Sequence, residues 1–185
     1  MLPIIIIIIL GITLAWMYNS LIARKNDVLR SYGTIEVILR KRYDLIPNLV
    51  ETLKQYMGYE SGLLNEVTEL RSRAMGSTSA SDEKLKVDSL LAQKLQNLMV
   101  VAENYPELKA NQSFAMIQGS WKELEDQLQY ARTAYNDSVT RYNNTVEMFP
   151  TNIMASMMEY KTKKLFEVME GEQENVKAEE LFSKK

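Results

Sequence analysis

An apolar stretch without a charged side chain runs from Leu2 to Ile22, and the first charge along the chain is that of Arg24. A helix rises about 1.5 Å per residue, so this stretch can cross roughly 30 Å of hydrocarbon. We therefore predict a single transmembrane helix over 2–22. The predicted anchor residues are Ile4, Ile5, Ile6, Ile7, Ile8, Ile9 and Leu10 in lipid, with Trp16 and Tyr18 at the membrane–water interface.

Beyond the anchor, apolar positions recur in alternating steps of four and three residues, which is the spacing of one helix face. A proline removes one helical hydrogen bond and crowds the carbonyl four residues earlier, here that of Tyr43. The phase of the first series nevertheless continues past Pro47, so we expect a kink within one helix that continues from the anchor. The alternative is a new helix capped by Asp44. The series comprises Val28, Tyr32, Ile35, Leu39, Arg42, Ile46, Leu49, Leu53 and Tyr56.

Three further helices follow from the same spacing. A helix over about 60–75 would bury Leu63, Val67, Leu70 and Ala74, and a third helix would bury Val87, Leu91, Leu95, Leu98 and Ala102. The longest series ends before Pro150 and comprises Phe114, Ile117, Trp121, Leu124, Leu128, Ala131, Tyr135, Val139, Tyr142, Val146 and Phe149. The predicted fold is all-α, with the transmembrane helix continuing into an antiparallel four-helix bundle with long helices over 23–150.

Two stretches after Pro150 differ in composition from the bundle. Residues 151–170 are amphipathic and rich in methionine, which suits adaptable packing surfaces. We expect this segment to pack on the bundle or on a neighbouring subunit, and the alternative is an amphipathic helix on an anionic leaflet. Residues 171–185 form an acidic tail, for which we expect mobility.

The composition excludes several classes of function. Basic and acidic residues number 22 and 24, so the chain lacks the concentrated positive field of a nucleic-acid-binding surface. It contains no cysteine and no histidine, which removes thiol nucleophiles, the commonest general base and the commonest transition-metal ligand. We predict no catalytic residue, no cofactor and no metal site. Carboxylate pairs such as Glu66 with Glu69, or Glu123 with Asp126, are interpreted as solvated helix faces.

Basic residues predict the orientation of the anchor. Arg24, Lys25 and Arg30 follow it, whereas no charged side chain precedes Ile4. Cytoplasmic flanks carry the excess of positive charge, so the N-terminus would lie outside and the helical domain in the cytoplasm. The stretch lacks a basic leading region and a small-residue cleavage site, which favours a retained single-pass anchor over a cleaved signal.

Three blocks of the sequence combine aromatic, asparagine and proline residues at close spacing. They are Arg42-Tyr43-Asp44-Leu45-Ile46-Pro47-Asn48-Leu49-Val50, Tyr105-Pro106-Glu107-Leu108-Lys109-Ala110-Asn111, and Ala131-Arg132 followed by Tyr135-Asn136, Val139 and Tyr142-Asn143. Together they resemble the LemA family of bacterial membrane-anchored helical proteins. The resemblance implies an N-terminal membrane helix and a helical bundle facing the cytoplasm at the bacterial inner membrane, and it does not imply an activity.

Arg42 stands in the apolar series at a position where a leucine would fit. Our interpretation is that its stem packs against the bundle while its head reaches water or a carboxylate. The alternative is a buried ion pair with Glu125 or Asp126 that fixes the register of the helices. Pro47 and Asn48, from the same block, are further candidates for a role in interaction or register.

Two Tyr-Asn pairs lie seven residues apart on the last long helix and therefore share a face. They are Tyr135-Asn136 and Tyr142-Asn143, with Arg132 beside them. We expect core tyrosines flanked by polar contacts. The alternative is a polar groove that binds a partner segment.

A similar line of seven-residue spacing occurs on the first helix. It consists of Asn19, Asn26 and Gly33. A glycine on a helix face lets another helix approach closely, so this line is a candidate contact between protomers.

These features favour an interaction protein over an enzyme. We expect a scaffold or adaptor that self-associates in the inner membrane, because anchored copies share one plane and modest contacts then suffice for assembly. The expected partners are membrane lipid and further copies of the chain, and not nucleic acid. The alternative is an accessory or regulatory subunit of a membrane protein complex such as a protease.

Overall fold

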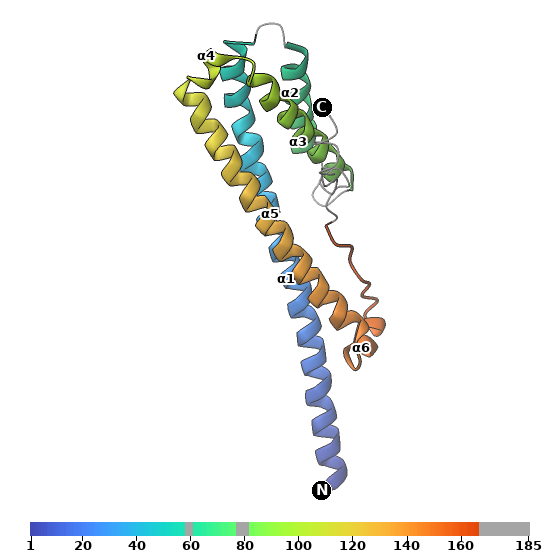
Figure 1. Cartoon of the computed structure of the whole chain (residues 1–185). Coiled ribbons are helices and arrows are strands. Elements are labelled where there is room, and N and C mark those ends of the chain that lie inside the picture. Colours follow the sequence, from blue (N-terminus) through green and yellow to red (C-terminus); the bar gives the residue numbers. More distant parts are fainter. Residues whose placement is uncertain (58–60, 77–81, 167–185) are drawn as a thin grey trace, which may run out of the picture. The chain divides into compact units, whose positions relative to one another are not determined.

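The computed structural model describes residues 1–57, 61–76 and 82–166, with the side chains of 82–86 left out. The described chain is helical, and its helices are α1 (Leu2–Lys54), α2 (Ser61–Gly76), α3 (Asp82–Ala102), α4 (Pro106–Lys109), α5 (Gln112–Glu147) and α6 (Thr151–Met157) (Figure 1). The chain divides into two compact units, each described by itself. Unit 1 comprises Met1–Tyr32 and Arg132–Lys185, and unit 2 comprises Gly33–Ala131.

Helix α1 is continuous over 53 residues and includes Pro47 in its interior. The alternative of a new helix beginning near Asp44 is therefore wrong. At its N-terminal end the isoleucine side chains Ile4 to Ile9 are between 52% and 68% exposed, so they are not packed against protein. The helix is long and apolar enough to cross a membrane.

Unit 2 has a core of aliphatic side chains at the predicted spacings. All five apolar positions predicted for α3 are buried, and on α2 Val67, Leu70 and Ala74 are buried as expected. Leu64 is buried in place of the expected Leu63, which is only half-buried. Helix α2 packs against α3, and Lys94 Nζ lies 2.9 Å from Glu66 Oε1 between them.

Helix α5 begins at an asparagine cap. The Oδ1 atom of Asn111 accepts a hydrogen bond from the backbone N–H of Phe114 at 3.1 Å, and its Nδ2 atom donates to the hydroxyl of Tyr56 at 2.9 Å. The cap satisfies one of the free N–H groups of the first turn. It also links the start of α5 to the residues that follow α1.

The C-terminal end of α5 differs from the prediction at Phe149, which is 81% exposed. The helix ends at Glu147, and a cis Phe149-Pro150 peptide bond follows. Phe149 lies beyond the end of the helix, so the helical spacing no longer predicts its burial.

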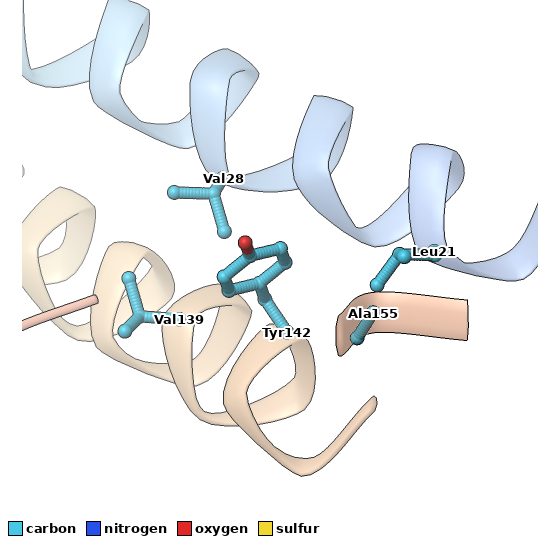
Figure 2. Close-up of a cluster of buried hydrophobic side chains, with 5 residues drawn as sticks. All are labelled: Leu21, Val28, Val139, Tyr142 and Ala155. Carbon is cyan, nitrogen blue, oxygen red and sulfur yellow. The ribbon is translucent and has the colours of Figure 1, made fainter. Parts of the chain in front are cut away.

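The core of unit 1 is a small cluster drawn in Figure 2. Leu21 and Val28 come from α1, Val139 and Tyr142 from α5, and Ala155 from α6. Partly buried side chains packed against this cluster are Tyr135, Val146, Met154, Met158 and Tyr160. Part of the methionine-rich segment thus packs on its own chain, as expected.

The helix in the methionine-rich segment is short, so the alternative of one amphipathic helix through this segment is wrong. Helix α6 ends at Met157, and Glu159 adopts φ 56°. The N–H of Tyr160 donates to Ala155 O at 2.9 Å and that of Glu159 to Ser156 O at 3.2 Å. This is a Schellman cap, in which a left-handed residue closes the helix and redirects the chain.

The residues after the cap, 160–166, have no helical structure, and we call them the strap. The predicted acidic tail, 171–185, lies outside the described residues.

The capping geometry gives a first prediction. Asn111→Ala should lower the free energy of unfolding by about 1 kcal/mol, because the N–H of Phe114 loses its acceptor. Asn111→Asp should retain most of the stability, since a carboxylate still caps the helix, and any remaining loss reports the bond to Tyr56. Denaturant unfolding followed by circular dichroism measures both. The exposed Asn104 supplies the control, and an equal loss in Asn104→Ala would contradict the assignment.

Candidate functional site

Two clusters of polar side chains stand out, one in each unit. In unit 2, Arg42 of α1 is 1% exposed. Its Nη1 atom donates to Glu125 Oε1 of α5 at 3.0 Å, and its Nη2 atom donates to Asp88 Oδ1 of α3. The hydroxyl of Tyr43 donates to the same Asp88 oxygen at 2.8 Å, and the guanidinium carbon lies 5.7 Å from the centre of the Trp121 ring.

The pKa of Arg42 reflects two opposed effects. Burial lowers the pKa, but the negative charges of Asp88 and Glu125 and the hydrogen bond to Asp88 outweigh it, so the net shift is upward. Arg42 therefore stays charged inside the core. A buried charge is tolerated only when it is paired and hydrogen-bonded, and this pairing requires α1, α3 and α5 to meet at one register.

The Arg42 head was expected to reach water or a carboxylate, and it contacts carboxylates while buried, as in the alternative of a buried ion pair. Of the two proposed partners Glu125 is correct, while Asp126 is exposed. The stronger partner, Asp88, was not predicted. A signal for it exists, because Asp88, Leu91 and Leu95 follow the same steps of three and four as the buried face of α3.

Pro47 explains a second contact in the same cluster. A proline has no N–H, so the carbonyl of Tyr43 loses its normal helical donor. The Nε atom of Arg71 on α2 donates to that carbonyl at 2.7 Å. The tertiary structure thus replaces the missing bond, which is how α1 continues through a proline.

In unit 1, the two asparagines of α5 bind the backbone of the strap. Asn143 Nδ2 donates to Lys163 O at 2.9 Å, and Lys163 N–H donates to Asn143 Oδ1 at 2.9 Å. Asn136 makes the same pair of bonds with Phe166, at 3.0 and 2.7 Å. The hydroxyl of Tyr142 donates to Lys161 O at 3.1 Å.

The distance between the two asparagines along α5 matches the distance between their two partner residues along the strap. Seven residues along a helix advance about 10.5 Å, and three residues of extended chain advance about 10 Å. Asn136 and Asn143 are seven apart, while Phe166 and Lys163 are three apart. Two turns of α5 therefore match the length of the strap between Lys163 and Phe166. The predicted alternative was a groove for a partner segment, whereas here the asparagines bind a segment of their own chain.

Aromatic side chains close the end of the strap. The ring of Phe166 lies 5.7 Å from that of Tyr135 in an edge-on arrangement, and the guanidinium carbon of Arg132 is 5.5 Å from its centre. Tyr135 also packs edge-on against Tyr32 at 6.0 Å. Burial raises the pKa of the Tyr135 hydroxyl, and burial followed by the nearby Tyr160 raises the pKa of Tyr142, so both hydroxyls remain neutral.

The remaining candidates are not brought into either cluster. Asn19 and Asn26 are exposed on α1. A Cβ added at Gly33 would meet no atom of the described residues within 4 Å, so packing within this part of the chain does not require glycine there. Asn48 is exposed and lines an open cleft of about 360 Å³ with residues such as Thr52 and Ser113.

Neither cluster has the composition of a catalytic centre. In the described ranges, no three acidic side chains lie close enough to hold a metal ion. The carboxylates of Asp88 and Glu125 are engaged by Arg42, and the asparagines of α5 are engaged by the strap. Both clusters hold segments of the chain together.

Comparison with known proteins places the chain in a family. The sequence model of the LemA family matches residues 31–179. The chain belongs to the LemA family. The match includes Arg42, Pro47 and both strap-binding asparagines, and it confirms the family suggested by the three sequence blocks.

Relatives of this LemA-family chain come from different bacteria. It is 24% identical over 167 residues to Protein LemA of Metamycoplasma hominis, covering 88% of this chain and 74% of the relative. It is 21% identical over 180 residues to Magnetosome protein MamQ 2 of Paramagnetospirillum magneticum, covering 84% of this chain and 66% of that protein. Magnetosome protein MamQ of Magnetospirillum gryphiswaldense is 20% identical over 179 residues, and 66% of its length is covered. None of these names states a reaction.

The Pro47 contact predicts a coupling between two helices. Arg71→Met should lower the free energy of unfolding by about 1–2 kcal/mol, because the carbonyl of Tyr43 is left without a donor. In a Pro47→Ala background the loss should shrink, since the introduced alanine supplies the missing N–H. A double-mutant cycle with denaturant unfolding measures the coupling. Equal losses of unfolding free energy in both backgrounds would show that Arg71 does not act through the Tyr43 carbonyl.

The Arg42 cluster predicts a larger coupling. Arg42→Met or Asp88→Leu alone should each cost about 3–5 kcal/mol, because one buried charge loses its partner. The double variant should cost at least roughly 2 kcal/mol less than the sum, since no unpaired charge remains between the two positions. The exposed Arg40→Met on the same helix is the matched control. Additive losses in thermal or denaturant unfolding would rule out the buried pair.

Proposed function

We propose that this LemA-family chain is a membrane-anchored, non-catalytic helical scaffold that self-associates at the bacterial inner membrane. The observation that supports it most directly is the unpacked apolar start of α1. Side chains from Ile4 to Leu10 are more than half exposed, which is costly in water but favourable in lipid. The same helix runs on without interruption into the polar clusters.

The arrangement we propose for residues 23–150 is the antiparallel four-helix bundle expected from the sequence. Support comes from the contacts of unit 2, where Arg42, Asp88 and Glu125 join α1, α3 and α5, and Arg71 joins α2 to α1. A body of this kind offers rigid helix faces to neighbours. With every copy anchored in one plane, weak contacts between such faces are enough for assembly.

The proposed orientation has the N-terminus outside and the helical domain in the cytoplasm. It is supported by Arg24, Lys25 and Arg30, which follow the apolar stretch. Because the chain contains no cysteine, one introduced cysteine reports the topology without background. A thiol reagent that does not cross membranes should label Leu2→Cys in intact cells and label Lys122→Cys only after lysis. The reverse pattern would overturn the orientation.

The anchor gives a prediction with a matched control. Ile12→Asp should shift part of the protein from the membrane fraction to the alkaline wash, because Ile12 is the midpoint of the predicted span and a carboxylate at the centre of a spanning helix costs about 3 kcal/mol. Val37 lies on the same helix and is also more than half exposed, yet Val37→Asp should stay in the membrane. Release of the unmodified protein by the wash would contradict the anchor.

Self-association is tested on the same preparation. Native mass spectrometry of the full chain in detergent should show a uniform multimer without another polypeptide. A monomer would overturn the scaffold proposal. A second polypeptide in fixed stoichiometry would instead indicate an accessory subunit of a membrane complex.

A further inference from the structure

Between its two end residues, the strap is held by its backbone and not by its side chains. Among the described residues, its hydrogen bonds to α5 are the two reciprocal amide pairs of Asn136 and Asn143 and the bond from Tyr142. The side chains of residues 161–165 are exposed, and only the end residues, Tyr160 and Phe166, are half-buried. Release of the strap would therefore uncover apolar surface only where these two end rings pack.

The chemistry of the site is that of a neighbouring β-strand. Each asparagine amide offers one donor and one acceptor to the same residue, as a paired strand does. Proteins that bind extended peptides by adding them to a sheet edge use the same backbone bonds for affinity and a few side-chain contacts for selectivity. Here the selective contacts lie at the two ends of the segment.

The end contacts define the ligand. The ring of Phe166 packs against Tyr135 and Arg132. The ring of Tyr160 lies 5.1 Å from Lys25 Nζ and its hydroxyl accepts a hydrogen bond from that atom at 3.5 Å. The site thus fits an extended peptide with aromatic residues six positions apart and no proline at either asparagine-paired residue.

We propose that this site also binds the strap of a second copy, so that exchanged straps link neighbouring molecules. The inference rests on the proposed self-association and names the surface that carries it. A second copy presents the same seven residues, Tyr160 to Phe166, so every bond made within one chain can be remade between two. Copies held in one membrane plane meet at high effective concentration.

The turn between α6 and the strap carries two opposed contributions, strain at Glu159 and the two hydrogen bonds of the cap. Glu159 is a non-glycine residue with φ 56°, a conformation that costs energy for a residue with a Cβ. Release of the strap lets Glu159 return to negative φ. The closed arrangement therefore stores a small penalty at the turn about which the strap would swing.

Peptide binding to the full chain in detergent tests the site. The probe is a fluorescent, acetylated and amidated peptide of residues 160–166, followed by anisotropy. Binding to the unmodified protein should be weak, because its own strap occupies the site. Phe166→Ala in the protein should strengthen binding roughly tenfold by raising the fraction of open sites.

Two matched controls identify the contacts. In the Phe166→Ala background, Asn136→Ala with Asn143→Ala should abolish saturable binding, whereas Asn144→Ala, an exposed neighbour, should leave it unchanged. A peptide with proline in place of Lys163 should fail, because it lacks the N–H that Asn143 accepts, whereas proline in place of Thr162 should be tolerated. Equal binding of the two proline peptides would overturn the site, whatever the protein variants do to folding.

A mixing experiment tests the second copy as occupant. Native mass spectrometry should show smaller assemblies for the Asn136→Ala/Asn143→Ala protein and for the Phe166→Ala protein when each is alone. When the two are mixed, one supplying the strap and the other the site, mixed assemblies should return. If the double asparagine variant keeps the assembly of Asn144→Ala, strap exchange is wrong while self-association stands. A monomeric unmodified protein overturns both.

Discussion

A positive charge inside an apolar core is the constraint around which the described helices of unit 2 are arranged. Arg42 is 1% exposed, and its charge can stay there only if negative groups reach it from other helices. Asp88 supplies one from α3 and Glu125 supplies another from α5. An aliphatic core tolerates small slips between helices, whereas this one fails when a partner moves by a single residue. We expect the cluster to favour one register of the helices more than it adds stability.

The proline next to this cluster creates a further attachment, between α1 and α2. In an isolated helix Pro47 would be a defect, because the Tyr43 carbonyl has no internal donor. The carbonyl instead accepts a hydrogen bond from Arg71, so the defect becomes a specific attachment point for α2. Adjacent residues of one short sequence block thus attach α1 to three other helices.

Sequence reasoning predicted the helices well and their pairings only in part. The positions buried along α3 follow from the spacing of apolar residues alone. The unpacked apolar start of α1 follows from the uninterrupted apolar stretch. Spacing could not distinguish Leu63 from Leu64, because both flank the same helix face. Asp88 was missed because its pairing with Arg42 depends on which helices become neighbours, and that is decided by the tertiary fold.

The strap shows a different limit of prediction from sequence. The seven-residue repeat of Asn136 and Asn143 was visible in the sequence, and a groove for a segment was one of its two interpretations. The segment itself was not visible, because the asparagines contact main-chain atoms that every residue except proline shares. An amphipathic helix was one interpretation of 151–170, but α6 ends at Met157.

Because α5 binds the strap through main-chain atoms, the sequence of the strap can vary while the contacts stay the same. The five residues between the terminal aromatic rings point their side chains into solvent, so lysine, glutamate or serine would be held equally well. The fold therefore places little demand on the identity of the side chains at these positions. The charge of the exposed side chains can therefore change without altering the hydrogen bonds that hold the segment against α5.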